Sequence, residues 1–527
     1  MKLMNKKTNY SGVMPSPAST IDSHPLPEGE GGCAVALYPL ALWERGCESF
    51  NVSGGEGCEN SPMKSFIAEV KLTALLAEAV TPAKSDVAAV IKRALRLKGL
   101  SLKETAVLLQ CSDQRLVRRM FAAAKKVKEH IYGKRLVLFA PLYITNYCVN
   151  NCLYCGFRAA NRRLKRQRLT LKEIKKEVAA LEAVGHKRLL LIGGEDPVAG
   201  SIDFLEKAIA AAYSVKTDDG CGEIRRLNVN VAPMSVKDFK RLKKTGIGTY
   251  QLFQETYHPS AYRQMHPHGP KADYEYRLYG MHRAMAAGID DVGIGALFGL
   301  YDHKFEVLAL LSHALELEKQ FGAGPHTISV PRLEPALNAP LASHPPFKVS
   351  DNDFKKIIAI LRLAVPYTGL ILSTRETKKL RNELFGLGIS QISAGSRTTP
   401  GGYHSAKQGN PAAEQFTLHD DRSLLEVIKD ISKMGYSPSF CTACYRMGRT
   451  GQDFMDLAKP GLIQQFCLPN SLLTFKEYLI DYGDPRANQG GEKVISKQLK
   501  EIKPAVLRNK VKQKLVKLGS GQRDLYF

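Results

Sequence analysis

Short apolar runs alternate with amphipathic stretches through the middle of the chain. Eight runs rich in Val, Ile, Leu and Phe fall at 135–145, 188–197, 225–233, 249–258, 291–302, 327–335, 369–376 and 391–402. Near-continuous apolar runs are typical of parallel strands buried on both faces, and the segments between them carry apolar residues at helical spacing. Thr170 and Glu173 predict a capping box at the start of one such helix. Eight strand–helix units predict an α/β fold, a (β/α)8 barrel, over 134–414.

Helical patterns flank the predicted barrel on both sides. Residues 63–133 repeat apolar positions at helical spacing and end on Gly133, a suitable helix C-cap. Residues 415–527 predict a mainly helical C-terminal extension. Residues 1–62 are rich in Gly, Pro, Ser and Glu and have no period, so we expect disorder or, alternatively, sequence that is not natively coding. In that case Met63 would be the start, which N-terminal sequencing of the natural protein would test.

Charge and hydropathy change this picture only slightly. The 527 residues include 75 Lys and Arg against 51 Asp and Glu, a net charge of +24. The basic residues spread along amphipathic helices, so a nucleic-acid partner is less expected than an anionic small molecule or an acidic protein. Because there is no run of about 18 apolar residues and no apolar segment after the basic start, we expect no membrane span and no signal peptide. The expected location is the cytoplasm.

Six of the 11 cysteines form two triplets. They are Cys148, Cys152 and Cys155, spaced CX3CX2C, and Cys441, Cys444 and Cys467, spaced CX2CX22C. Clustered cysteines in a large chain indicate metal or redox chemistry rather than an extracellular disulfide framework. Three thiolates suit an iron–sulfur cluster with one iron left open. Zinc with a remote fourth ligand, or a zinc knuckle at the second triplet, is the structural alternative.

The first triplet resembles the motif of the radical S-adenosylmethionine (SAM) enzymes. The resemblance implies a 4Fe-4S cluster whose open iron is chelated by the methionine part of SAM. Reduction by one electron then cleaves SAM, and the resulting 5′-deoxyadenosyl radical removes hydrogen from the substrate. Tyr154 matches the position that packs on adenine, and Gly193, Gly194 and Glu195 match the motif that binds the SAM ammonium.

Further polar residues gather where the predicted strands end. Asn230, Gln254 and Glu255 are candidates for binding the SAM hydroxyls or the substrate, and they could equally form the polar layer of the barrel.

Longer stretches resemble one family of radical SAM enzymes, the HydG tyrosine lyases of FeFe-hydrogenase maturation. They include "LFAPLYITNYCVNNCLYCGFR", "GPHTISVPR", "CTACYRMGRTGQDFM" and "RDLYF". The resemblance implies a carbon–carbon lyase that cleaves L-tyrosine to p-cresol and dehydroglycine, and then forms carbon monoxide and cyanide on a second iron–sulfur cluster with an extra iron. The implied partners are an electron donor, a maturation scaffold and partner maturases.

Two alternatives remain open. A lyase that stops at dehydroglycine for thiazole synthesis would share the barrel motifs, and a zinc-clamped basic barrel that binds nucleic acid would be no enzyme at all.

A tyrosine carboxylate buried in a barrel needs a cation beside it. Arg332 is the first candidate and Arg397 the second, and strand-end arginines of this kind can also pair with structural carboxylates. Glu334 stands where the family often carries a second arginine, which weakens the case for two arginines on the substrate.

The extra iron of the family takes a histidine ligand. His313 is the candidate here, with His266 and His268 as alternatives. Glu316 occupies the position of a second histidine that the family often has.

Overall fold

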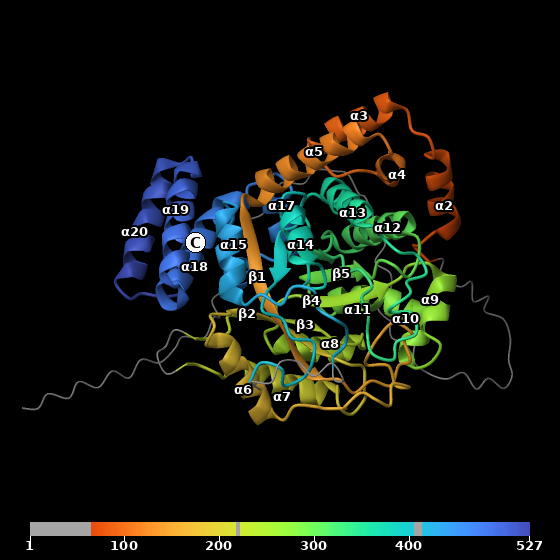
Figure 1. Cartoon of the computed structure of the whole chain (residues 1–527), viewed down its shortest axis with the longest axis horizontal. Coiled ribbons are helices and arrows are strands. Elements are labelled where there is room, and N and C mark those ends of the chain that lie inside the picture. The colour runs from red at the N-terminus through yellow and green to blue at the C-terminus, as the bar shows by residue number, and fades with distance from the viewer. Residues whose placement is uncertain (1–64, 218–221, 405–413) are drawn as a thin grey trace, which may run out of the picture.

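Eight parallel strands close into a barrel in the computed structural model, which describes residues 65–217, 222–404 and 414–527. Each strand pairs with the next from β1 to β8, and β8 pairs back to β1 (Figure 1). The strands are β1 Arg135–Thr145, β2 Arg188–Gly193, β3 Arg226–Asn230, β4 Tyr250–Glu255, β5 Val292–Ala296, β6 Thr327–Ser329, β7 Gly369–Leu372 and β8 Gln391–Ser393. Each begins within one of the eight apolar runs, so the predicted (β/α)8 barrel is confirmed.

Helices surround the barrel and bury their apolar faces on it. They are α6 Leu171–Glu182, α7 Ile202–Tyr213, α8 Val236–Lys244, α9 Pro259–Met265, α10 Tyr274–Leu278, α11 Gly280–Ala286, α12 His303–Phe321, α13 Asp351–Ala364 and α14 Lys378–Phe385. The capping box of α6 is present: the Thr170 hydroxyl accepts from Glu173 N at 3.2 Å, and the Glu173 carboxylate accepts from Thr170 N at 2.7 Å. Two helices, α10 and α11, lie between β4 and β5 where the helical pattern over 274–288 is continuous, and a Cβ on Gly280, the first residue of α11, would lie 2.6 Å from Leu252 of β4.

Further helices lie on either side of the barrel in sequence. Before it come α2 Glu69–Glu78, α3 Lys84–Ala94, α4 Leu102–Gln110 and α5 Gln114–Tyr132, and after it α15 Leu424–Lys433, α16 Ala443–Arg446, α17 Gly451–Ala458, α18 Gln464–Tyr482, α19 Pro485–Glu501 and α20 Ala505–Gly519. None of the helices in the described part of the chain is long and apolar enough to cross a membrane. Residues 1–62 lie outside the described residues, and the division into 63–133, 134–414 and 415–527 stays a prediction.

A ninth strand, not expected from the sequence, joins the C-terminal region to the barrel. β9 (Ser437–Ser439) pairs in parallel with Arg135–Val137 of β1. It is three residues long and contains Pro438, which a strand at a sheet edge tolerates. The 11 residues of β1 span about 33 Å at ~3.3 Å per residue. β1 therefore starts beside the C-terminal cysteine segment and ends at the first cysteine loop.

Glu306 on α12 is a buried carboxyl that should make stability depend on pH. Its Oε2 accepts from Tyr257 N at 2.9 Å and its Oε1 from the Thr256 hydroxyl, while burial raises its pKa to about 8. Because the folded pKa exceeds the unfolded value, the stability from this group is full below about pH 4.5 and is lost as pH rises through 8. Glu306→Gln mimics the neutral form. We expect the melting temperature of the parent to fall relative to this variant between pH 6 and 8.5, by the equivalent of about 1–2 kcal/mol.

Scanning fluorimetry measures this difference. Glu316→Gln, on the same helix with a partly exposed side chain, is the control and should follow the parent at every pH. Parallel pH curves for the parent and Glu306→Gln would contradict the prediction.

Candidate active site and second cysteine site

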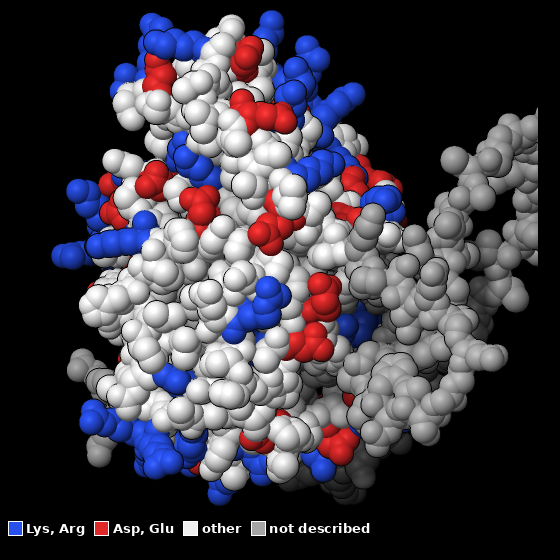
Figure 2. All heavy atoms as spheres, turned by 90° about the vertical axis from the view of Figure 1, so that its right-hand side faces the viewer, with Lys and Arg blue, Asp and Glu red and all other residues white. Residues whose placement is uncertain are grey.

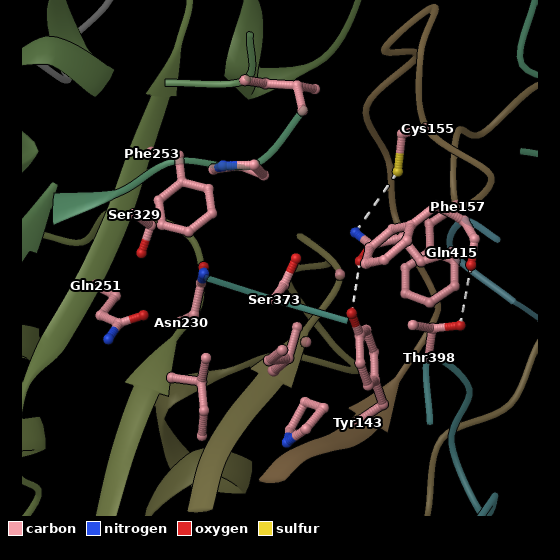
Figure 3. Close-up of a pocket in the computed structure, with 18 of the residues that line it drawn as sticks. Tyr143, Cys155, Phe157, Asn230, Gln251, Phe253, Ser329, Ser373, Thr398 and Gln415 are labelled. Atoms are coloured by element: carbon pink, nitrogen blue, oxygen red, sulfur yellow. Dashed lines mark hydrogen bonds between the residues drawn. The ribbon is translucent and has the colours of Figure 1, made fainter. Parts of the chain in front are cut away.

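A cavity of about 210 Å³ lies inside the barrel at the carboxyl ends of the strands. Strand side chains that point inward form its apolar wall: Phe139, Leu190, Ile192, Phe253 and Ile371. Others add polar groups: Asn230, Gln251, Ser329, Ser373 and Ser393. Figure 3 shows several of these side chains pointing toward one another across the cavity. A largely apolar cavity with a few polar groups is the usual form of a small-molecule site.

The first cysteine triplet lines the mouth of this cavity. Cys148, Cys152 and Cys155 are free thiols on the loop after β1. Burial raises the pKa of Cys152 to about 12, so a thiolate there needs a bound cation at neutral pH. An iron–sulfur cluster supplies that cation, and the donor set therefore fits the group that the sequence predicts.

The Gly-Gly-Glu segment is tied directly to this loop. Glu195 accepts from Val149 N through its carbonyl at 2.8 Å and from Asn150 Nδ2 through Oε2 at 2.6 Å. A Cβ on Gly194 would lie 2.2 Å from the carbonyl oxygen of Tyr147, so only glycine allows this close approach. The predicted SAM-binding segment thus lies against the cysteine loop.

Changing Gly194 to alanine should weaken SAM binding. The added methyl would push the cysteine loop away from the Gly-Gly-Glu segment, and overpacking of this kind costs about 1–3 kcal/mol. We expect the dissociation constant for SAM, measured by equilibrium dialysis on reconstituted protein, to rise about tenfold or more. Gly193→Ala is the control, because its Cβ would meet only side chains, the nearest being Thr145 at 3.3 Å. Equal affinities for the two variants would refute the steric explanation.

Of the other predicted cofactor residues, three line the cavity and one faces the surrounding helices. Tyr154 lines the cavity, and its hydroxyl hydrogen-bonds His266 Nε2 at 2.8 Å. Asn230 and Glu255 line it as well. Burial alone would raise the pKa of Glu255, but Lys271, 2.7 Å away, and Arg277 lower it below its usual value. Gln254 points to the opposite face of β4 and donates to Tyr274 O at 3.4 Å, as the period of two in a strand requires.

Neither predicted substrate arginine lines the cavity. Arg332 forms a two-point ion pair with Glu376 and a contact of 2.9 Å with Asp351. Arg397 donates to Ser396 O at 3.1 Å and lines a separate hollow beside α15. Their role at the substrate stays a prediction that this geometry does not favour.

Two other arginines line the cavity: Arg277, which lies 3.6 Å from the Glu255 carboxylate, and Arg375. Arg375 is the better candidate for the substrate. It stacks on the Phe416 ring, with 3.3 Å from its guanidinium carbon to the ring centroid, and burial lowers its pKa. In the described residues it forms no ion pair with a carboxylate. Arg375 is half-buried, and Glu334 and Glu255 act on it only from beyond ion-pair distance. A guanidinium with no direct ion pair at the wall of an apolar cavity is unfavourable, and the carboxylate of an amino-acid substrate would supply that pair.

Gln415 is a further site residue that the sequence did not indicate. Its Nε2 lies 3.7 Å from the Cys155 sulfur, and its Oε1 accepts from the Tyr143 hydroxyl at 2.7 Å (Figure 3). Its carbonyl accepts from Gly156 N at 3.1 Å. The segment after residue 413 therefore closes the cavity beside the cysteine loop, although nothing in its sequence pattern predicts that position.

The second triplet lies at the opposite end of the barrel. Cys441 follows β9, Cys444 is on α16, and Cys467 is buried on α18. Burial raises the pKa of Cys467 to about 12, and the neighbouring Arg135 at the start of β1 opposes this rise. Arg188, at the start of β2, donates to Cys441 O at 2.5 Å.

These two arginines fit an anionic cluster held by the second triplet. Arg135 and Arg188 each bury an Nε with no hydrogen-bond partner in the described part of the protein. Buried cations beside neutral thiols would be unfavourable, whereas thiolates bound to a cluster would balance them. Among residues 65–217, 222–404 and 414–527, no group of three or more His, Cys, Asp or Glu side chains is arranged to hold a single metal ion. Cysteines that each bind a different iron of a cluster do not have to converge on one point.

The predicted histidines lie away from the second triplet. His313 contacts Tyr257, Phe66 and His282, with Tyr257 OH 2.8 Å from its Nδ1. His266 belongs to the first site through Tyr154, and the carbonyl of His268 accepts from Asn151 N at 3.1 Å, beside the first triplet.

His326, just before β6, is the histidine at the second site. Its ring lies 4.2 Å from that of Phe454 on α17, the helix between Cys444 and Cys467. Burial lowers its pKa to about 4, while Asp291, 3.9 Å away, opposes the shift. A neutral imidazole is the form that binds metals. The sequence analysis did not single out His326, although the arginines that begin β1, β2 and β3 were a visible signal at this end of the barrel.

Comparisons with known proteins agree with this arrangement. Residues 142–312 match the radical SAM superfamily, and residues 329–437 match the Biotin and Thiamin Synthesis associated domain. The 2-iminoacetate synthase of Escherichia coli (strain K12) is 31% identical over 366 residues, which cover 69% of this chain and 93% of that protein.

Two solved structures of the [FeFe]-hydrogenase maturase HydG are more similar. The first is 52% identical with a TM-score of 0.84 and covers 88% of this chain and 100% of that one. The second, from Carboxydothermus hydrogenoformans, is 43% identical with a TM-score of 0.75 and covers 85% and 98%. Both matches extend far beyond the radical SAM region. The chain therefore belongs to the radical SAM superfamily and, within it, to the HydG family of maturases.

Proposed function

We propose that this protein is a radical SAM lyase that cleaves L-tyrosine between Cα and Cβ. The products are p-cresol and dehydroglycine, and the second is converted to carbon monoxide and cyanide at the second cysteine site for FeFe-hydrogenase assembly. One observation carries the proposal: the two cysteine triplets lie at opposite ends of the same strand, β1, with a cavity inside the barrel at the first. Family membership supports the same activity.

The residues of the cavity have distinct parts in the first step. When bound, a 4Fe-4S cluster with SAM supplies a radical that takes one hydrogen atom from the substrate. Arg375 pairs with the tyrosine carboxylate, and the apolar wall formed by Phe139, Phe253 and Ile371 holds the aromatic ring and excludes water. Tyr143 and Gln415 hold the Cys155 side of the cavity in place.

The second step belongs to the other end of the barrel. Cys441, Cys444 and Cys467 would bind the second iron–sulfur cluster, with Arg135 and Arg188 balancing its charge. His326 would bind the extra iron, in place of His313. The dehydroglycine fragment would pass through the barrel interior, because that path keeps small products from escaping into solvent. A maturation scaffold and partner maturases would receive the product.

Anaerobic reconstitution with iron and sulfide, followed by incubation with tyrosine, SAM and dithionite, tests the proposal. Assays for p-cresol, cyanide and carbon monoxide should all be positive, and electron paramagnetic resonance should detect reducible clusters. A second candidate is a lyase that stops at dehydroglycine, which the likeness to the E. coli 2-iminoacetate synthase favours. It predicts p-cresol without carbon monoxide. A protein that binds only zinc and forms no p-cresol would refute both.

A further inference from the structure

The loop that follows the first cysteine triplet is strongly basic. Residues 158–168, here called the basic loop, contain six Lys or Arg and no Asp or Glu. Arg162, Arg163, Lys165 and Arg168 are exposed. α20 is also basic and has no Asp or Glu, but it spreads five Lys or Arg over 15 residues. The higher density of the basic loop calls for an explanation of its own.

Hydrogen bonds fix the basic loop against the cysteine loop. The Asn146 side chain donates to Lys165 O at 2.9 Å and accepts from Gln167 N at 2.7 Å. Arg166 donates to the carbonyls of Asn146 and Phe157 at 2.6 and 2.7 Å. Asn146 lies two residues before Cys148. The positive charges are therefore held at the edge of the first cysteine site.

These charges are not neutralised by the protein itself. In the described ranges, none of the six cations forms an ion pair with a carboxylate. Arg158 instead donates to the Asn151 side chain at 2.8 Å, and Arg168 lies over the Phe204 ring at 4.9 Å. Like charges held together repel one another, and such a patch raises the local concentration of an anionic partner.

Apolar side chains complete the surface. Tyr147 and Val149, on either side of Cys148, are 41% and 37% exposed. An apolar centre beside a charged rim is the usual anatomy of a protein–protein interface. Figure 1 shows β1 running down to the lower edge of the molecule, and Figure 2, turned about the vertical axis, shows Lys and Arg gathered along that lower edge.

We propose that the basic loop, together with Tyr147 and Val149, is the docking surface for an acidic one-electron donor protein. The inference rests on the proposed function, because the first cysteine site then needs one electron for each turnover. The donor is oxidised by one electron and the site is reduced by one, with no atom transferred. Nucleic acid would also match the charge, but it would not explain why the patch adjoins the site that must be reduced.

Charge reversal on the loop tests this docking. Flavodoxin, an acidic flavoprotein, is the probe, and the variant is R162E/R163E/K165E. Arg166 is left intact because it holds the loop backbone. The control is K493E/K497E/K500E, which makes the same change in net charge on exposed positions of α19. Binding of flavodoxin to the full-length reconstituted protein is measured by biolayer interferometry at two salt concentrations, and p-cresol formation is measured with reduced flavodoxin and with dithionite.

We expect the dissociation constant for flavodoxin to rise about tenfold or more in the loop variant and to change less than about twofold in the control, with the salt dependence reduced only in the former. Dithionite needs no docking, so p-cresol formation with it should stay within about twofold of the parent. Unchanged flavodoxin affinity, equal losses with both reductants, or loss of binding to an RNA probe alone would overturn the proposal. A parent that forms no p-cresol with dithionite would refute the proposed function instead, while flavodoxin binding would still be measurable.

Discussion

Replacing Cys444 by serine should abolish carbon monoxide formation while p-cresol formation stays within about threefold of the parent. The first cysteine site and its cavity lie at the far end of β1, about 33 Å away along the strand, so the tyrosine step does not need the second cluster. A serine hydroxyl is a poor substitute for a soft thiolate at iron. Cys444 is chosen because it is only partly buried on the short α16, and the change should disturb the packing little.

The experiment assays p-cresol by chromatography and carbon monoxide by trapping with haemoglobin. Cys441→Ser should behave in the same way, because the hydrogen bond from Arg188 goes to the Cys441 carbonyl and survives the change. Cys111→Ser is the control: Cys111 is a buried free cysteine outside both triplets, and its loss should affect neither product. If p-cresol disappeared together with carbon monoxide, the second triplet would be a structural element and the two-site proposal would fail.

Hydrophobic periodicity was sufficient for the barrel because every strand is buried on both faces and therefore reads as a continuous apolar run. β9 is also buried but was not predicted, because its sequence, Ser-Pro-Ser, is no apolar run. It has three residues and a proline, and only pairing with the start of β1 makes it a strand. Local pattern carries no information about such a pairing.

The first triplet could be placed at the cavity from the sequence because its three cysteines lie on one loop directly after β1, whereas Cys467 on α18 lies well apart in sequence from Cys441 and Cys444. The direction in which each strand-end arginine points could not be predicted from the sequence. Arg332 and Arg375 both follow strands, and which of them enters the cavity depends on Glu376, which is 44 residues from Arg332 in sequence and pairs with it. The histidine ligand stays a prediction, and the sequence could not point to His326, because its contact with Phe454 joins segments far apart in the chain.

Removing the Arg375 guanidinium should have a large effect on tyrosine turnover. For Arg375→Ala we expect kcat/KM for tyrosine to fall about 30- to 1000-fold, mainly through KM, since truncating one partner of a buried charge pair costs about 2–5 kcal/mol. Arg375→Lys should recover only part of the loss, because an ammonium cannot make the planar two-point contact with a carboxylate. Binding of SAM, measured separately, should stay within about threefold, which would place the defect at the amino acid.

Arg332→Ala is the matched comparison and distinguishes the two arginines. Arg332 pairs with Glu376 and Asp351 and does not line the cavity. Its loss leaves the buried Glu376 carboxylate without its guanidinium partner. We therefore expect Arg332→Ala to lower the melting temperature, while KM for tyrosine stays within about threefold of the parent. The reverse result, a large rise in KM for Arg332→Ala and none for Arg375→Ala, would restore the assignment made from sequence. It would also require Glu376 to release Arg332 when tyrosine binds. That exchange is unfavourable in a buried site, because Glu376 would give up two hydrogen bonds from the guanidinium without gaining a new partner.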